Sequence, residues 1–224
     1  MSIKILITDP ISSKGIDLLK NEGYEVIYKP DIPSKEYDEY ISDIDGWIIR
    51  SGTKITKNHI IDSNKLQIIG RAGVGVDNID IPQATLNGII VMNVPDGNTV
   101  SAAEHTIAML LSLSRNVQLG HSSLLDGKWD RSKLTGSELQ EKILGVIGLG
   151  KIGREVIKRA TSFNMKIIGF DPYVNQDQFD ENEVKIVTLD EITKNSDYIT
   201  LHIPMNDSTK NLFDLKRIKK MKTR

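Results

Sequence analysis

One segment near the middle of the chain constrains the fold more than any other. A strand-like run, residues 142–147, leads directly into Gly148-Leu149-Gly150-Lys151-Ile152-Gly153, and a helical pattern follows from Arg154 to about Phe163. At this spacing the first glycine makes a tight turn, the second lets the backbone approach a ligand, and the third lets helix and strand pack closely. The segment therefore predicts a strand that turns sharply into a helix.

The residues around this turn indicate what it binds. The free amides and the dipole at the start of a helix face an anion, which suits a pyrophosphate. A second strand, residues 165–170, ends at Asp171, near the ~20-residue spacing at which a carboxylate meets a ribose diol. Such a carboxylate favours NAD and repels the 2′-phosphate of NADP. The pattern predicts a Rossmann-type dinucleotide-binding domain, and the alternative is a chance glycine-rich turn.

A third strand of this domain is predicted at residues 198–202, after a short helix that follows residues 187–192. Residues that follow such a strand line the cofactor cleft, which makes His202, Ile203 and Pro204 candidate cofactor contacts. His202 can also be interpreted as an acid–base group. No carboxylate lies near it in sequence to tune it, so the lining role is favoured.

The first part of the chain alternates strand and helix. Strands are predicted at residues 3–8, 24–28, 46–50, 66–70 and 88–92, with helices near 12–22, 34–41, 56–63 and 79–86. Strict alternation with short β-branched strands predicts a parallel sheet with helices on both faces. We expect the flavodoxin-like strand order 2-1-3-4-5, and another α/β layering is the alternative.

In that order, ligands bind beyond the carboxyl ends of the strands, near the switch between strands one and three. The residues there read Arg50-Ser51-Gly52-Thr53, and the next strand is followed by Gly70-Arg71-Ala72-Gly73-Val74-Gly75-Val76-Asp77. A guanidinium, two hydroxyls and an open backbone can hold a carboxylate or phosphate. Taken alone, the pattern favours an ordinary exposed arginine in a Ser/Gly turn, with an anion site as the alternative.

A break in composition at residues 93–98 predicts a boundary between a first domain, residues 1–96, and a second, residues 97–224. An amphipathic helix follows it, with a capping box predicted at Ser101 and Glu104. Core or subunit-interface packing explains its apolar stripe, and His105 within it is interpreted as structural. The stripe consists of Val100, Ala103, Ile107, Leu110, Leu111 and Ser114.

Composition excludes several classes of function. Twenty-nine Lys and Arg residues face 30 Asp and Glu residues, so nothing in the charge favours nucleic acid or an anionic membrane as partner. The absence of cysteine excludes disulfides, zinc–thiolate sites and a cysteine nucleophile. No apolar stretch approaches the ~18 residues that a membrane span needs. We expect a cytoplasmic protein without a metal site.

Together these stretches resemble the D-isomer-specific 2-hydroxyacid dehydrogenase family, most closely its D-3-phosphoglycerate dehydrogenase branch. The resemblance runs over nearly the whole chain. The motifs that carry it are residues 50–54, 70–80, 92–98, 101–104, 126–129, 148–153 and 201–204. Residues 50–54 followed by 70–80 are the part that points to phosphoglycerate.

The resemblance implies NAD-linked oxidation of 3-phospho-D-glycerate to 3-phosphohydroxypyruvate, in serine biosynthesis. By this resemblance, Arg50 and Ser51 engage the substrate phosphate. The other implied substrate contacts are the backbone of Gly73, Val74 and Gly75, beside the carboxylate. The implied cofactor contacts are Val74, Gly148, Gly150, Lys151, Ile152, Gly153, Asp171, His202, Ile203 and Pro204.

The resemblance also implies that the family's catalytic arginine, glutamate and histidine would lie beyond Arg224. We therefore expect the chain to be C-terminally truncated, its dinucleotide domain incomplete, and the 224 residues alone to be inactive. Strand 143–147 is then expected to keep an exposed edge, and the first sheet to be partly uncovered. Family members dimerise through the NAD domain, and the stripe at residues 100–114 fits that role. The alternatives are a dehydrogenase of another D-2-hydroxy acid and a non-catalytic NAD-responsive binding protein.

Overall fold

The structure, a computed structural model, describes residues 2–223. The chain forms two compact units, Met1–Asn98 and Thr99–Arg224. Each unit has a hydrophobic core of its own, built around its own parallel sheet. No helix among the described residues is long and apolar enough to cross a membrane.

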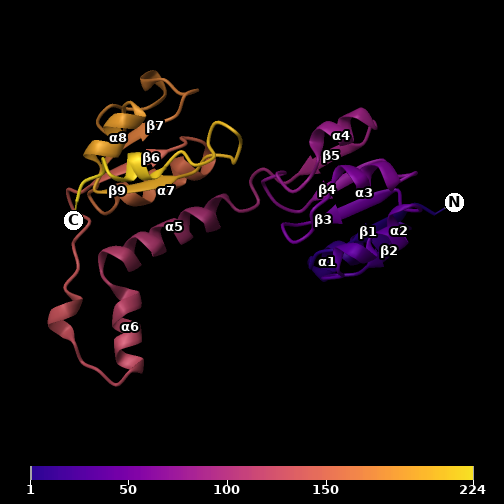
Figure 1. Cartoon of the computed structure of the whole chain (residues 1–224), viewed down its shortest axis with the longest axis horizontal. Helices are drawn as coiled ribbons and strands as arrows, with labels where there is room; N and C mark the ends of the chain where they lie inside the picture. Colours follow the sequence, from indigo (N-terminus) through magenta and orange to yellow (C-terminus); the bar gives the residue numbers. More distant parts are fainter. Residues whose placement is uncertain (1, 224) are drawn as a thin grey trace. The chain divides into compact units, whose positions relative to one another are not determined.

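The first unit is built on a five-stranded parallel sheet with the order β2-β1-β3-β4-β5, as the alternation of strands and helices predicted (Figure 1). The strands are β1 (Lys4–Ile7), β2 (Glu25–Tyr28), β3 (Gly46–Ile49), β4 (Ile68–Arg71) and β5 (Ile90–Asn93). The connecting segments contain α1 (Ser13–Asn21), η1 (Ser34–Glu36), α2 (Asp38–Ile41), α3 (Lys57–Asp62) and α4 (Ile81–Leu86). The expected flavodoxin-like α/β fold is confirmed.

The two faces of this sheet differ in what covers them. Leu6, Trp47 and Ile69 are fully buried in a core that includes side chains of α2, α3 and α4. On the opposite face Ile90 and Met92 are 60% and 53% exposed and line an apolar groove of about 490 Å³. The strands of a parallel sheet are normally buried on both faces. At this groove, in contrast, apolar side chains of the sheet are open to solvent.

The second unit begins with two helices, α5 (Thr99–Ser114) and α6 (Val117–Leu125), and the short η2 (Arg131–Leu134). The elements that follow are β6 (Ile143–Ile147), α7 (Lys151–Thr161), β7 (Lys166–Phe170), η3 (Gln176–Gln178), β8 (Lys185–Ile186), α8 (Leu189–Asn195), β9 (Tyr198–Leu201) and α9 (Leu215–Ile218). The sheet has the order β8-β7-β6-β9 with all pairs parallel. This is the strand–helix arrangement of a Rossmann domain, as predicted.

β6 lies inside this sheet, which corrects the expectation that it would keep an exposed edge. Its residues pair with β7 on one side, and Leu144 to Ile147 pair with Tyr198 to Leu201 of β9 on the other. The crossover through α8 returns the chain to the free side of β6. Within the described residues, the edge strands of this sheet are therefore β8 and β9.

Two helices begin earlier than predicted. α7 starts at Lys151 rather than Arg154, because Gly150 is its N-cap and Gly153 already lies in the first turn. α5 starts at Thr99, so Ser101 lies inside the helix and is not the N-cap of a capping box. In both cases residues that were predicted to precede or begin the helix already lie inside it.

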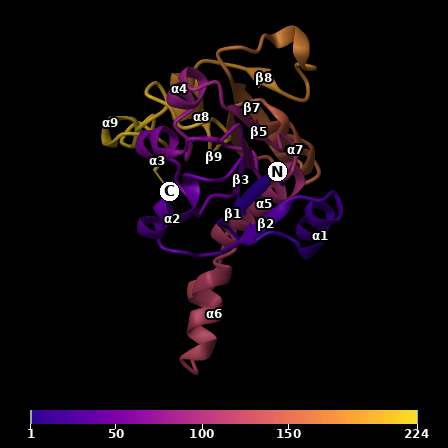
Figure 2. The same cartoon turned by 90° about the vertical axis from the view of Figure 1, so that its right-hand side faces the viewer.

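The apolar stripe of α5 is core rather than subunit interface. Ala103, Ile107, Leu110 and Ser114 are buried in the core of their own unit, where α5 packs against α7. Of the predicted stripe only Val100, 52% exposed, lies at the surface. α6 buries none of its residues, and Figure 2 shows it projecting away from the sheet of the same unit.

Candidate cofactor and substrate sites

The glycine-rich turn connects β6 to α7 at the carboxyl end of the second sheet. Gly148 has a φ of +90°, which residues with a side chain rarely adopt. A Cβ at this position would overlap the carbonyl of His202 and contact the side chain of Ile203. The turn therefore lies directly against the segment that follows β9, and the structure brings these three predicted cofactor residues together.

The other two glycines of the motif have different surroundings. A Cβ built on Gly150, the N-cap of α7, would meet no atom within 4 Å, so the backbone is open to a ligand there. A Cβ on Gly153 would overlap the carbonyl of Gly148, so this glycine permits the helix to approach the turn. The first amides of α7 at Ile152 and Gly153 precede the first intrahelical bond, which Arg154 donates to Gly150. An open backbone at a helix start fits a pyrophosphate.

Asp171 follows β7 and is tied to the glycine-rich turn. Its Oδ2 accepts a hydrogen bond of 2.9 Å from the Leu149 N–H, and its Oδ1 accepts one of 2.9 Å from the Tyr173 N–H. Each carboxylate oxygen has a second lone pair, so the group can still accept bonds from two ribose hydroxyls. The sequence pattern predicted a ribose ligand at this position, and the structure adds its bond to the turn.

His202 is half-buried directly after β9. The backbone N–H of His202 donates to the Ile147 carbonyl at 2.7 Å, and the ring Nε2 lies 2.9 Å from the Thr200 hydroxyl. Burial lowers the pKa of the imidazole, which favours the neutral ring. Its hydrogen-bond partner is a hydroxyl rather than a carboxylate, so the geometry favours lining over acid–base chemistry. Pro204, two residues on, accepts a 2.6 Å bond from the Thr209 hydroxyl through its carbonyl.

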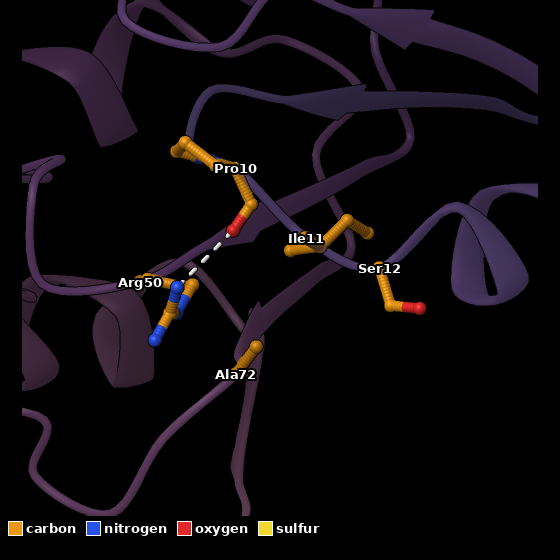
Figure 3. A pocket seen from close by; sticks show the side chains of 5 residues that line it. All are labelled: Pro10, Ile11, Ser12, Arg50 and Ala72. Atoms are coloured by element: carbon orange, nitrogen blue, oxygen red, sulfur yellow. Dashed lines mark hydrogen bonds between the residues drawn. The ribbon is translucent and has the colours of Figure 1, made fainter.

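Two cavities meet at Arg50 in the first unit, at the carboxyl ends of its strands. One, of about 390 Å³, is lined by Pro10, Ile11, Ser12, Arg50 and Ala72 (Figure 3). There the Arg50 guanidinium donates to the Pro10 carbonyl at 3.3 Å. The other, of about 420 Å³, is lined by Arg50, Ser51, Arg71, Ala72, Gly73, Val94, Gly97 and Asn98. The structure thus brings Arg50, Ser51 and Gly73 to one cavity, beyond the carboxyl ends of β3, β4 and β5, and the first cavity lies at the predicted switch between β1 and β3.

Arg71 also lines this second cavity, although it was not among the residues expected there. Its guanidinium lies over Gly73, where a Cβ would overlap it, and its Nε is buried without a hydrogen-bond partner. It ends β4, the neighbour of β3, so the strand order already placed it beside Arg50. Two predicted residues, Val74 and Gly75, do not line either cavity. The Val74 carbonyl instead accepts a 2.6 Å bond from Asn93.

Comparison with known proteins identifies the family. Residues 107–224 match the model of the NAD-binding domain of D-isomer specific 2-hydroxyacid dehydrogenases. The chain belongs to this family. Its second unit is accordingly an NAD-binding domain, and the turn, the helix start and Asp171 described above are suited to that cofactor.

The relatives include D-3-phosphoglycerate dehydrogenases and other dehydrogenases. The D-3-phosphoglycerate dehydrogenase of Methanocaldococcus jannaschii is 44% identical over 98% of this chain and 42% of its own length. The NAD-bound 3-phosphoglycerate dehydrogenase of Entamoeba histolytica has a TM-score of 0.81 and 32% identity, over 99% of this chain and 69% of that one. The NAD-dependent formate dehydrogenase of Staphylococcus aureus, solved with NAD, has a TM-score of 0.89 and 33% identity, over 98% and 71%. The chain spans about two fifths of the length of the curated relatives that it matches.

Proposed function

We propose that the chain forms the substrate-binding domain, residues 1–96, and part of the NAD-binding domain of a D-3-phosphoglycerate dehydrogenase. The observation that carries this proposal is the cavity beyond β3 and β4, which Arg50 and Arg71 both line. Two cations beside Ser51 suit a substrate with two anionic groups, a phosphate and a carboxylate. The identity to D-3-phosphoglycerate dehydrogenases supports the same substrate.

In the proposed reaction 3-phospho-D-glycerate would lose a hydride from C2 and its hydroxyl proton and become 3-phosphohydroxypyruvate, and a bound NAD would supply the hydride acceptor. Arg50 and Ser51 bind the phosphate, and the backbone at 73–75 lies beside the carboxylate. In the second unit, the start of α7 at Lys151 and Ile152 binds the pyrophosphate, and Asp171 binds the adenosine ribose. The remaining proposed cofactor contacts are Val74, Gly148, Gly150, Gly153, His202, Ile203 and Pro204.

The test compares two substrates that differ only in the phosphate, 3-phospho-D-glycerate and D-glycerate, in the intact protein. Arg50→Ala should raise KM for the phosphorylated substrate by roughly 10-fold or more, the effect of one lost charge-assisted bond, and leave that for D-glycerate nearly unchanged. Lys54→Ala, an exposed cation four residues on, is the matched control and should change neither. Equal loss for both substrates, or weaker NAD binding in Arg50→Ala, would contradict the assignment. Preference for an unphosphorylated hydroxy acid would favour another D-2-hydroxy acid dehydrogenase.

We expect the 224 residues, assayed alone, to bind NAD weakly at most and not to oxidise phosphoglycerate. Oxidation needs a general base that accepts the hydroxyl proton and that a neighbouring group, such as a carboxylate, holds in position. His202 is hydrogen-bonded to a threonine, and His59 Nδ1 accepts from the Thr56 N–H as part of a helix cap. Within the described residues, no histidine forms an ion pair with a carboxylate. Production of NADH from phosphoglycerate by the 224 residues alone would refute this part.

The proposed partner is a second copy of the chain, bound through α5 and α6. Large apolar side chains are exposed along both helices, and monomers rarely expose large apolar patches without a partner. They are Met109, Leu113, Val117, Leu119, Leu124 and Leu125. Light scattering after size exclusion should give at least a dimer, and Leu113→Asp with Val117→Asp should give a monomer. A monomer before substitution would exclude this interface.

A further inference from the structure

The turn that carries Arg50 and Ser51 is tied down by an aspartate from another strand. Asp9 follows β1, which pairs in parallel with β3, so the segments after the two strands lie at the same edge of the sheet. Asp9 Oδ2 accepts a 2.7 Å bond from the Arg50 N–H and a 3.1 Å bond from the Thr53 N–H. Asp9 is only 5% exposed. One buried oxygen therefore holds both ends of the four-residue turn.

The carbonyl side of the same turn is held by an asparagine. Asn78 Nδ2 donates to the Arg50 carbonyl at 2.7 Å and to the Thr53 carbonyl at 2.6 Å. The Asn78 backbone carbonyl accepts a further bond of 2.8 Å from the Ile55 N–H. The first and last peptide groups of the turn are thus fixed on both sides, by two side chains from distant parts of the sequence.

This arrangement leaves the tip of the turn available to a ligand. The Ser51 side chain is exposed, and Arg50 reaches both cavities described above. Gly52 lies so close to Asp9 that a Cβ there would overlap Oδ1, so the carboxylate lies directly beneath the tip. The negative charge of a carboxylate at this position would repel an anionic substrate. Its presence is explained by the two amides that it holds, and not by contact with a substrate.

We propose that Asp9 is a positioning residue for the substrate anion: it orders the turn 50–53 so that Arg50 and Ser51 face the cavity. The inference rests on the proposed function, in which these two residues bind the substrate phosphate. Because both amides bond to the same oxygen, the single carbonyl oxygen of an asparagine can replace it. Asp9→Asn should therefore keep the turn, whereas Asp9→Ala should release it.

The first measurement needs no ligand. Amide hydrogen exchange of the full chain, followed by NMR, should be at least 10-fold faster at Arg50 and Thr53 in Asp9→Ala than in the unmutated protein. It should be nearly unchanged in Asp9→Asn and in Asp17→Ala, which removes an exposed carboxylate from α1. Amides within β4 serve as an internal reference for global stability. Unchanged exchange at Arg50 and Thr53 in Asp9→Ala would overturn the inference.

The second measurement titrates the same variants with 3-phosphoglycerate and, separately, with NAD. Asp9→Ala should weaken phosphoglycerate binding by about 10-fold or more, the scale of a displaced binding group, and leave NAD binding unchanged. Asp9→Asn should retain the affinity, a rescue that general destabilisation does not predict. Equal losses in Asp9→Asn and Asp9→Ala, or no loss in Asp9→Ala, would refute the positioning role. Should the unmutated protein not bind phosphoglycerate while exchange responds as expected, the proposed substrate would be wrong and the ordering of the turn would stand.

Discussion

Replacement of Asp171 by alanine tests whether one carboxylate both orders the glycine-rich turn and selects the cofactor. In the structure this carboxylate accepts backbone bonds of 2.9 Å from Leu149 and from Tyr173. Under the proposed function, the ribose hydroxyls of NAD would bond to the same oxygens, while the 2′-phosphate of NADP would meet a like charge. Alanine removes the ribose contact, the repulsion of NADP and the tie to the turn at once.

The expected magnitude follows from the kind of bond that is lost. A hydrogen bond to a charged group contributes about 1.5–3 kcal/mol, which corresponds to a rise of roughly 10- to 150-fold in the Kd of NAD. The loss for NADP should be smaller, because the repulsion disappears together with the contact. Calorimetric titration of both cofactors measures the two values. A lower melting temperature by a few degrees should accompany them, because the Leu149 and Tyr173 amides lose their acceptor.

Asp177→Ala is the matched control, since it removes an exposed carboxylate from the same unit. It should change neither the Kd of NAD nor the melting temperature. Equal affinities of the unmutated protein for NAD and NADP would refute the argument. An unchanged Kd of NAD in Asp171→Ala would refute it as well.

Three further predictions concern the second unit. Gly150→Ala should leave the melting temperature unchanged but abolish NAD binding. Gly153→Ala should also lower the melting temperature, because its Cβ would overlap the Gly148 carbonyl. Circular dichroism measures the melting temperature and calorimetry measures NAD binding, so the two effects can be separated. Burial lowers the pKa of His202 below its ordinary 6.5, so the unfolded chain binds a proton at this imidazole more readily than the folded chain does. The stability that the neutral ring provides is therefore present above pH 6.5 and is lost as the pH falls below it. Urea titrations at several pH values should show a shallower decline in His202→Gln. Thr188→Ala should cost about 1 kcal/mol of unfolding free energy, since it removes the capping box of α8.

The fold was predictable because its signals are local and repeated. Each strand of the first unit is a short β-branched run, and the handedness of parallel crossovers then limits the strand order to few choices. The error about β6 arose at the next level. Sequence showed a strand at 198–202 but not which side of β6 it would join, and the structure pairs it with the side that was expected to stay open.

The site was predictable where a residue type has one role and not where the partner is distant. The three glycines and Asp171 follow a spacing that the chemistry of a dinucleotide requires, and the structure places them together. Arg71 was missed although the predicted strand order places it beside Arg50, and only the structure shows that its guanidinium folds over Gly73. Asp9 was missed because, next to Pro10, it has the pattern of an ordinary turn, and its bonds reach residues that are far along the chain.

Asp9 and Asp171 occupy equivalent places in two different sheets. Each follows a strand, and each accepts a backbone N–H from the turn after the neighbouring strand, Asp9 from Arg50 and Asp171 from Leu149. A carboxylate fixed at a strand end can order such a turn without using any side chain of the turn, whose outward groups then remain for a ligand. The two differ in exposure: Asp9 is buried, whereas Asp171 is partly exposed and can still reach a ligand. In this chain, therefore, Asp171 is open to direct contact with a ligand, whereas any effect of the buried Asp9 on binding passes through the turn that it holds.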